Sequence, residues 1–180
     1  VVIDGNVYGG GNKGVILNDT VHQGSNVVVR RIDSTTVIIN GGRIKGSVYG
    51  GGLGDTLVEK AGLVEGNTRV EMRGGTVVRS IYGGGQLGSV GTFNYNTVTY
   101  PANDPNGNAG KTVAVPISLK EEGTGRARVL VSGGRVGVIN QALMPTTNNP
   151  GDDELGWVFC GSQGLTDSIS WPHAIGHGDS

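Results

Sequence analysis

The chain has 180 residues, a net charge of −1 at pH 7 and 35 glycines, a glycine share more than twice the usual level of about 7%. No Gly-X-Y period runs through it, which excludes collagen, and its charges of both signs are scattered, which argues against nucleic-acid binding. The single cysteine excludes an internal disulfide, and no apolar run approaches the roughly 20 residues of a membrane-spanning helix.

A glycine-rich phrase of five residues recurs along the chain. Its copies are Val-Tyr-Gly-Gly-Gly at 7–11 and 48–52, Ile-Tyr-Gly-Gly-Gly at 81–85 and a degraded Val-Phe-Cys-Gly-Ser at 158–162. A Gly-Gly pair precedes the phrase, and Gly42 and Gly75 set the repeat length at 33 residues. Recurrence at such a period predicts a repeat architecture. The chain begins inside a repeat, because Val1–Tyr8 aligns with Gly42–Tyr49, which indicates a processed protein or an excised fragment.

A short alternating segment precedes each Gly-Gly pair. One face of this segment keeps an apolar residue in every copy while the other face varies, and the shared positions are held by Val37, Val70 and Val129. Such period-two alternation predicts half-buried strands. Each unit therefore consists of a strand, a Gly-Gly turn, a second strand, a Gly-rich turn and a variable connection. The units cover about 1–14, 27–55, 67–90 and 126–165.

These units predict a single all-β domain over residues 1–180, built as a parallel β-solenoid, that is, a right-handed β-helix. A unit this short buries its apolar face only by stacking on its neighbours, with equivalent residues about 4.8 Å apart. Tyr8, Tyr49, Tyr82 and Phe159 then form an aromatic ladder. The alternative is an antiparallel β-sandwich in which each Gly-Gly pair turns a hairpin.

Two stretches interrupt the repeat. Gly75 and Gly134 are 59 residues apart, 26 more than the repeat length, and the excess over residues 91–125 predicts an inserted β-hairpin. Its strands are expected at 92–100 and 111–119, joined by a turn-rich segment. The second interruption, at about 140–155, is expected to be a loop, and residues 166–180 a C-terminal tail.

The order strand, Gly-Gly, strand, Val-Tyr-Gly-Gly-Gly resembles the repeats of large adhesin-like bacterial cell-surface proteins, which are often built as β-helices. The resemblance covers roughly residues 1–90 and 126–165. It implies a secreted or cell-surface location and an adhesive or structural role, and it supplies no catalytic residues. The inserted hairpin and the degraded fourth copy depart from a regular array.

Two segments copy parts of phosphate-binding motifs. Gly9–Gly14 satisfies G-x-G-x-x-G, but a β-prone Val-Ile-Leu follows where a dinucleotide site needs a helix. Gly110–Thr112 ends like a P-loop, but Pro105 stands where that motif needs its first glycine. Both are better explained as turn sequences, and we expect no cofactor.

Three groups have metal-ligand residue types without a complete site. Asp104, Asn106 and Asn108 copy the start of a calcium loop that lacks its closing glutamate, and 152–154 form a short acidic run. His173 and His177, near Asp179, have a zinc-like spacing, but the proline and glycines around them disfavour the helix that would align them. We expect no metal.

We expect a non-enzymatic protein, with a polysaccharide lyase or hydrolase as the less favoured alternative. The outward strand positions carry charges that are mainly basic: Arg43, Lys45, Arg69, Glu71, Arg73, Arg79 and Arg128. Glycoside hydrolysis requires a pair of carboxyl groups, and the sequence places no such pair on adjacent units. It also contains no nucleophile-elbow motif.

The inserted hairpin holds three aromatic residues outside the repeat, Phe93, Tyr95 and Tyr100. Phe93 and Tyr95 alternate with asparagines, so exposed rings here would form a platform for sugar rings or a protein contact. If this face packs onto the stack instead, the rings become core.

The sequence therefore predicts an adhesive or structural segment of a secreted or surface protein, with a host protein or glycan as partner. A carbohydrate-binding module is the second hypothesis. Nucleic-acid and membrane partners are not expected. Open solenoid ends expose strand edges, so self-association through the ends is expected too.

Overall fold

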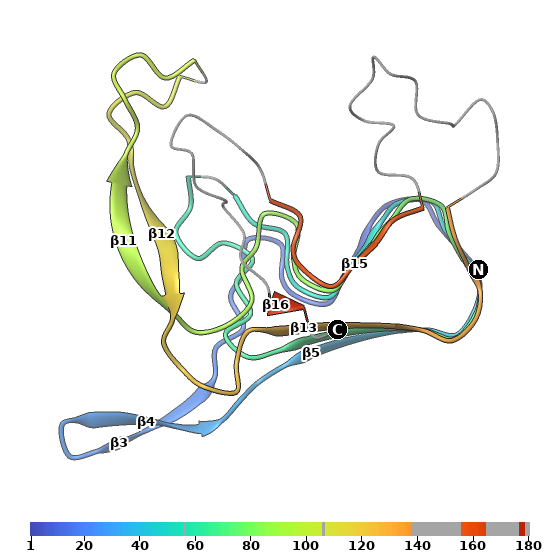
Figure 1. Ribbon diagram of the computed structural model, residues 1–180, viewed down its shortest axis with the longest axis horizontal. Coiled ribbons are helices and arrows are strands. Elements are labelled where there is room, and N and C mark those ends of the chain that lie inside the picture. The colour runs from blue at the N-terminus through green and yellow to red at the C-terminus, as the bar shows by residue number, and fades with distance from the viewer. Residues whose placement is uncertain (56, 106, 138–155, 165–176, 179–180) are drawn as a thin grey trace.

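The computed structural model describes residues 1–55, 57–105, 107–137, 156–164 and 177–178, and every regular element in them is a β-strand (Figure 1). The all-β class predicted from the sequence is therefore confirmed. Within these residues no helix has the length and apolar character that crossing a membrane requires.

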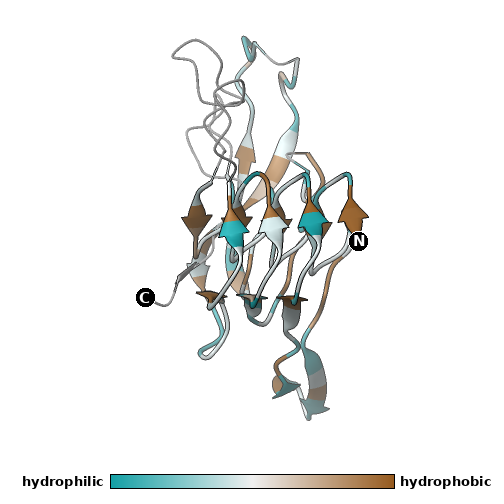
Figure 2. Ribbon diagram, turned by 90° about the vertical axis from the view of Figure 1, so that its right-hand side faces the viewer, coloured by the Kyte–Doolittle hydropathy of each residue, from teal (hydrophilic) through white to brown (hydrophobic). Residues whose placement is uncertain are grey.

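The repeated strands fall into four units, which stack side by side along one axis (Figure 2). Unit 1 holds β1 (Val2–Ile3) and β2 (Val7–Tyr8), and unit 2 holds β5 (Thr35–Ile39), β6 (Arg43–Ile44) and β7 (Val48–Tyr49). Unit 3 holds β8 (Thr68–Met72), β9 (Thr76–Val77) and β10 (Ile81–Tyr82). Unit 4 holds β13 (Arg126–Val131), β14 (Arg135–Val136) and β15 (Val158–Phe159), and β16 (His177–Gly178) pairs with β13.

Equivalent strands of successive units form three parallel sheets of four strands, in the orders β1-β6-β9-β14, β15-β10-β7-β2 and β16-β13-β8-β5. The register follows the sequence repeat, because Val70 lies opposite both Val37 and Val129. The antiparallel sandwich is wrong for these units. The strands on either side of each Gly-Gly pair belong to different sheets, and the pair turns the chain between them, with φ of 86° at Gly42 and 88° at Gly75.

Aliphatic side chains fill the interior of the stack. Its buried cluster consists of Ile39, Ile44, Val48, Val70, Met72, Val77 and Ile81. Even a two-residue strand contributes to this interior, because neighbouring side chains of a strand point to opposite faces. In β7, Val48 packs in the cluster, while Tyr49 points out of it. Burying each such aliphatic side chain contributes about 1.5–3 kcal/mol, so the stack is stabilised mainly by this interior.

The first glycine of the phrase is required by the stacking itself. A side chain on Gly9, Gly50 or Gly83 would collide with the backbone carbonyl of the equivalent residue in the following unit. Cys160 occupies this position in unit 4, where no further copy of the phrase follows among the described residues. Among the described residues, a side chain at this position of the fourth copy therefore meets no further unit.

Two antiparallel hairpins leave the same side of the stack (Figure 1). The strands expected at 92–100 and 111–119 are β11 (Phe93–Thr99) and β12 (Thr112–Leu119). The other hairpin, β3 (Asp19–Gln23) with β4 (Asn26–Arg31), is not predicted from the sequence. The sequence predicts that the second unit starts at about residue 27. In the structure residues 27–31 belong to β4, and the first strand of that unit starts at Thr35.

Two further expectations concern the C-terminal part. The loop expected at about 140–155 lies outside the described residues. Of the tail expected at 166–180, only His177–Gly178 is described, and it is a strand paired with Arg126 and Ala127 of β13. The two residues of β16 thus add a short parallel strand to the long sheet beside β13.

Candidate functional site

A concave, mainly polar groove lies beside the aromatic face of the stack. We call it the tyrosine groove. It encloses about 450 Å³, and its lining comes from three units: Asp4, Gly5, Asn6, Lys45, Gly46, Tyr49, Arg79 and Gln86. This volume falls within the range of about 300–1,000 Å³ that is usual for small-ligand sites.

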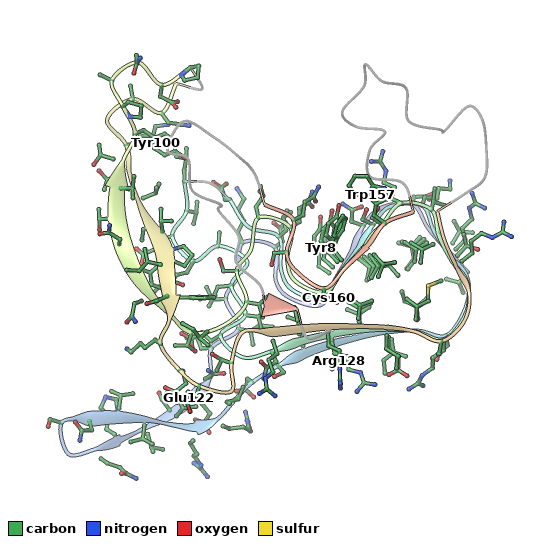
Figure 3. The ribbon with its side chains drawn as sticks, in the orientation of Figure 1. Tyr8, Tyr100, Glu122, Arg128, Trp157 and Cys160 are labelled. Carbon is green, nitrogen blue, oxygen red and sulfur yellow. The ribbon has the colours of Figure 1, made fainter. Side chains whose placement is uncertain are left out.

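The groove lies beside the ladder expected from the repeat phrase, and Tyr49 is the ladder residue in its lining (Figure 3). The rings of Tyr8 and Tyr49, and those of Tyr49 and Tyr82, stack with centroids 5.0 Å apart and interplanar angles of 8° and 7°. The Tyr82–Phe159 pair follows at 5.3 Å and 18°. The spacing is that of neighbouring parallel strands, because each ring stands on the equivalent residue of its unit.

Two glutamines accept hydrogen bonds from ladder hydroxyls, and the sequence analysis did not identify either of them. The Tyr49 hydroxyl donates to the amide oxygen of Gln163 at 2.7 Å, and the Tyr8 hydroxyl donates to that of Gln86. Each bond reaches from one unit to the unit two places further along the stack. The signal was available, because Gln86 and Gln163 each follow directly after a copy of the phrase and pair with each other as a β-bridge.

The groove offers polar edges rather than ring faces. Each inner ring is covered on both faces by its neighbours, and Tyr49 is 1% exposed. The rim carries charge, with Lys45 Nζ 2.6 Å from Asp4 Oδ1. Trp157 lies at the unit 4 end, edge-on to Phe159 at 5.4 Å. Such a surface suits a polar ligand held by hydrogen bonds along the groove.

Two of the three candidate aromatic residues of the inserted hairpin are buried. Phe93 is 5% exposed and Tyr100 is 2% exposed, so neither ring presents a face to a ligand. Tyr100 packs with Val113 and Val115 of β12, while Phe93 lies edge-on to Tyr95 with centroids 6.5 Å apart. Tyr100 thus belongs to an apolar cluster within the hairpin itself.

Tyr95 lies between the hairpin and the loop over residues 57–63. Lys60 Nζ is 5.3 Å from its ring centroid, a cation–π contact. Its hydroxyl is buried without a hydrogen-bond partner, beside a cavity of about 30 Å³ that is large enough for one water molecule. Burial raises the pKa of the Tyr95 phenol to about 12, and the charges of Glu65 and Glu59 add to the shift, so this group stays neutral at pH 7.

Glu71 is held between two arginines on the outward face of the long sheet. Glu71 Oε2 lies 2.8 Å from an Arg69 guanidinium nitrogen, and Glu71 Oε1 lies 2.7 Å from Arg73 Nε. The hydrogen bond from Arg73, with the charge of Arg69, holds the pKa of the Glu71 carboxyl below its ordinary value. A carboxylate held this way is a poor general acid, and Arg128, in register beside Arg69, adds a cation and no second carboxylate.

The motif-like segments have structural roles where they are described. Gly9–Gly14 is followed by β-bridges, and Lys13 within it pairs with Asp55 at 2.6 Å. Lys111 Nζ donates to Asn108, and Asp104 accepts a bond from the Asn108 backbone N–H, which closes a turn. Within the described residues no three His, Cys, Asp or Glu side chains converge to hold a metal. Asn106, 152–154, His173 and Asp179 lie outside those residues.

The second exposed feature is the β3–β4 hairpin. Val27 is 61% exposed and Val28 is 40% exposed, on opposite faces of β4. Arg31 pairs with Asp33 at 2.8 Å near the base of the hairpin. The two-residue turn Gly24-Ser25 closes its tip, with φ of 64° at Gly24. Both faces of β4 therefore carry an exposed valine.

Neither a family model, nor a curated protein, nor a solved structure matches this chain. Its function is therefore inferred from the geometry of its own residues.

Proposed function

We propose that the four units form a short right-handed parallel β-solenoid that acts as a rigid scaffold in an adhesive or structural segment of a secreted or cell-surface bacterial protein. The in-register stacking of Val37 on Val70 and of Tyr49 on Tyr82 supports the solenoid. The resemblance of the repeat phrase to adhesin-like surface proteins supports the location and the role.

One observation carries the adhesive role: both hairpins leave the stack from the same side, in the connections between the last strand of one unit and the first strand of the next. In repeat proteins, insertions gather on the face that meets partners. The β3–β4 hairpin supplies exposed Val27 and Val28 on this side, while the aromatic face of β11–β12 is used for packing. A host protein contacting β3–β4 is therefore the favoured partner.

A carbohydrate-binding role is the second candidate, and the tyrosine groove favours it. Its volume of about 450 Å³, its amide groups and its charged rim suit the hydroxyl groups of a sugar. In this proposal the sugar binds in the tyrosine groove and not on the aromatic residues of the inserted hairpin. We propose no enzymatic activity for the chain, since Glu71 is committed to two arginines.

A binding screen against host matrix proteins and glycans separates these roles. The hairpin variant Val27→Ser with Val28→Ser is compared with the groove variant Lys45→Ala and with the unchanged chain. Loss of a protein hit in the hairpin variant alone supports the adhesive role. Loss of a glycan hit in the groove variant alone supports the carbohydrate-binding role, and hits that survive both variants contradict both assignments. Release of reducing ends or unsaturated products from a polysaccharide would contradict the non-enzymatic proposal.

A further inference from the structure

Most of the arginines gather on the outer side of two repeat sheets. Six of the nine stand at outward positions on these strands or directly after them, and we call this surface the arginine face. It spans the sheets β1-β6-β9-β14 and β16-β13-β8-β5, which meet at the Gly-Gly turns. Figure 3 shows Arg128 pointing away from the interior of the stack. The six residues are Arg43, Arg69, Arg73, Arg126, Arg128 and Arg135.

The register of the sheets places these arginines in rows. Arg128 lies opposite Arg69 on the neighbouring strand, and Arg43 and Arg135 lie on either side of Thr76. Neighbouring parallel strands are about 4.8 Å apart, so the backbones of Arg43 and Arg135 are about 10 Å apart. Like charges directly opposite each other across two strands lower stability. The row of Arg69 and Arg128 is therefore a cost to the fold, and a bound anion would remove it.

Few acids oppose the charge of the arginine face. Glu71 is the one acid on the described strands of these two sheets, and Arg69 and Arg73 already share it. The remaining four arginines of the face are exposed and form no ion pair among the described residues.

The opposite side of the molecule is acidic. The connections at 9–34, 50–67 and 83–125, which carry the hairpins, hold six cations and eight acids. Five further acids lie outside the described residues. Charges that look scattered along the sequence are therefore separated in the structure, and the repeat sheets hold the basic share.

The residue types of the face select the chemistry of a ligand. A guanidinium group stays charged and donates two parallel hydrogen bonds to a carboxylate, sulfate or phosphate group. No aromatic residue stands on the described strands of these two sheets, so the stacking platform that binds the bases of single-stranded nucleic acids is missing. A polymer with repeated anionic groups suits a surface on which arginines recur from strand to strand.

We propose that the arginine face binds an anionic polysaccharide, whose carboxylate or sulfate groups contact Arg43, Arg128 and Arg135. The choice of a polysaccharide over a nucleic acid rests on the secreted or cell-surface location proposed above. This surface is separate from the tyrosine groove and from the β3–β4 hairpin. Because its arginines are exposed to solvent, binding weakens as salt rises from about 0.1 M to 1 M.

Isothermal titration calorimetry on the unchanged chain tests the proposal. Dextran sulfate presents sulfate groups, polygalacturonate presents carboxylates, and dextran is the uncharged control. Binding to either anionic polymer, but not to dextran, is expected, and the polymer that binds identifies the anionic group. The triple variant Arg43→Gln, Arg128→Gln, Arg135→Gln is expected to bind roughly tenfold more weakly, the combined effect of three exposed ion pairs.

A matched variant separates the arginine face from net charge. Arg30→Gln, Lys111→Gln, Lys120→Gln removes the same charge from the hairpins and is expected to bind like the unchanged chain. Equal weakening in both triple variants would overturn the proposal, as would the absence of binding to both anionic polymers. Duplex DNA bound as tightly as the better polysaccharide would overturn the choice of a polysaccharide.

Two further measurements keep the outcome clear. Circular dichroism and thermal melting check that both triple variants fold, and Arg128→Gln alone should melt no lower than the unchanged chain, because it relieves the repulsion from Arg69. The hairpin variant Val27→Ser with Val28→Ser should keep its polysaccharide binding. Failure of the adhesive hairpin and failure of the arginine face are therefore distinguishable.

Discussion

The Tyr49 hydroxyl donates a 2.7 Å hydrogen bond to the side-chain amide oxygen of Gln163, 114 residues further along the chain. The backbone of Gln163 is fixed independently, since its N–H donates to the Gly85 carbonyl and its carbonyl accepts from Leu87 N–H, both at 2.9 Å. The bond therefore joins unit 2 to the end of unit 4 across the intervening unit. It resists sliding of the units along the groove.

Replacing Gln163 with alanine is expected to lower the free energy of unfolding by about 0.5–1.5 kcal/mol, the usual contribution of one such hydrogen bond. Urea denaturation measures the loss. Tyr49→Phe removes the same bond from the other side, so the double variant should lose less than the sum of the two single changes. Strict additivity would show that the two side chains do not interact. Gln23→Ala, in the exposed hairpin, is the matched control and should be nearly neutral.

Stacking geometry makes the first glycine of the phrase irreplaceable in the inner units. Gly50→Ala places a Cβ against the Gly83 carbonyl and the Thr68 side chain, so the units must move apart. We expect a loss of about 1–3 kcal/mol or failure to fold. Gly41→Ala is the control, because nothing lies within 4 Å of its added Cβ. Equal melting temperatures for the two variants would contradict the close approach of neighbouring units.

The repeat strands and their ladders could be predicted from the sequence because they obey local rules. Val37, Val70 and Val129 occupy the same face of an alternating segment in three units. The first glycine of the phrase, shared by three of its four copies, lies where a side chain would collide with the backbone of the next unit. Equivalence in sequence then becomes adjacency in space. Cys160 stands at the equivalent position of unit 4, where no further copy of the phrase stacks among the described residues.

Glu71 should make the stability of the fold depend on acid pH. Its folded pKa is lowered from the ordinary value of 4.5 by its bond to Arg73 and the charge of Arg69, so the stabilisation is complete above 4.5 and is lost as pH falls through the folded pKa. Melting temperatures between neutral pH and pH 3 should fall more steeply for the unchanged chain than for Glu71→Gln. Parallel curves would show that the carboxylate is not held by the arginines.

Tyr95 should titrate late in alkali. Burial and the charges of Glu65 and Glu59 raise its folded pKa to about 12, so ionisation of this phenol costs the fold nothing below the ordinary value of 10.0, and stability falls as pH rises from there through about 12. The difference in tyrosinate absorbance between the unchanged chain and Tyr95→Phe should show a single step near pH 12. A step near pH 10 would mean that the phenol is solvated.

Tyr95→Phe also tests the buried hydroxyl. Among the described residues this oxygen has no hydrogen-bond partner, so removing it should leave stability unchanged or slightly higher at pH 7. Tyr49→Phe, which removes a bonded hydroxyl, should be destabilising by comparison. Urea denaturation of both variants measures the difference, and a larger loss for Tyr95→Phe would reverse this assignment.

The candidate site was less predictable, because it depends on packing between distant segments. Phe93 and Tyr100 have the composition of a ligand platform, but both rings are buried, and Tyr100 packs against Val113 and Val115 of its own hairpin. The β3–β4 strands lack a repeat equivalent, so no periodicity marks them. Gln86 and Gln163 each follow a copy of the phrase in the sequence, but their bonds to Tyr8 and Tyr49 reach across the stack and follow only from the packing of the units.

Nuclear Overhauser contacts in the isolated chain test the parallel stack most directly. The account predicts methyl contacts from Val70 to both Val37 and Val129, and ring contacts from Tyr49 to both Tyr8 and Tyr82. A strong contact between the α-protons of Ile39 and Ile44, with no contact from Val37 to Val70, would show a hairpin across the Gly41–Gly42 pair and would contradict the parallel stack.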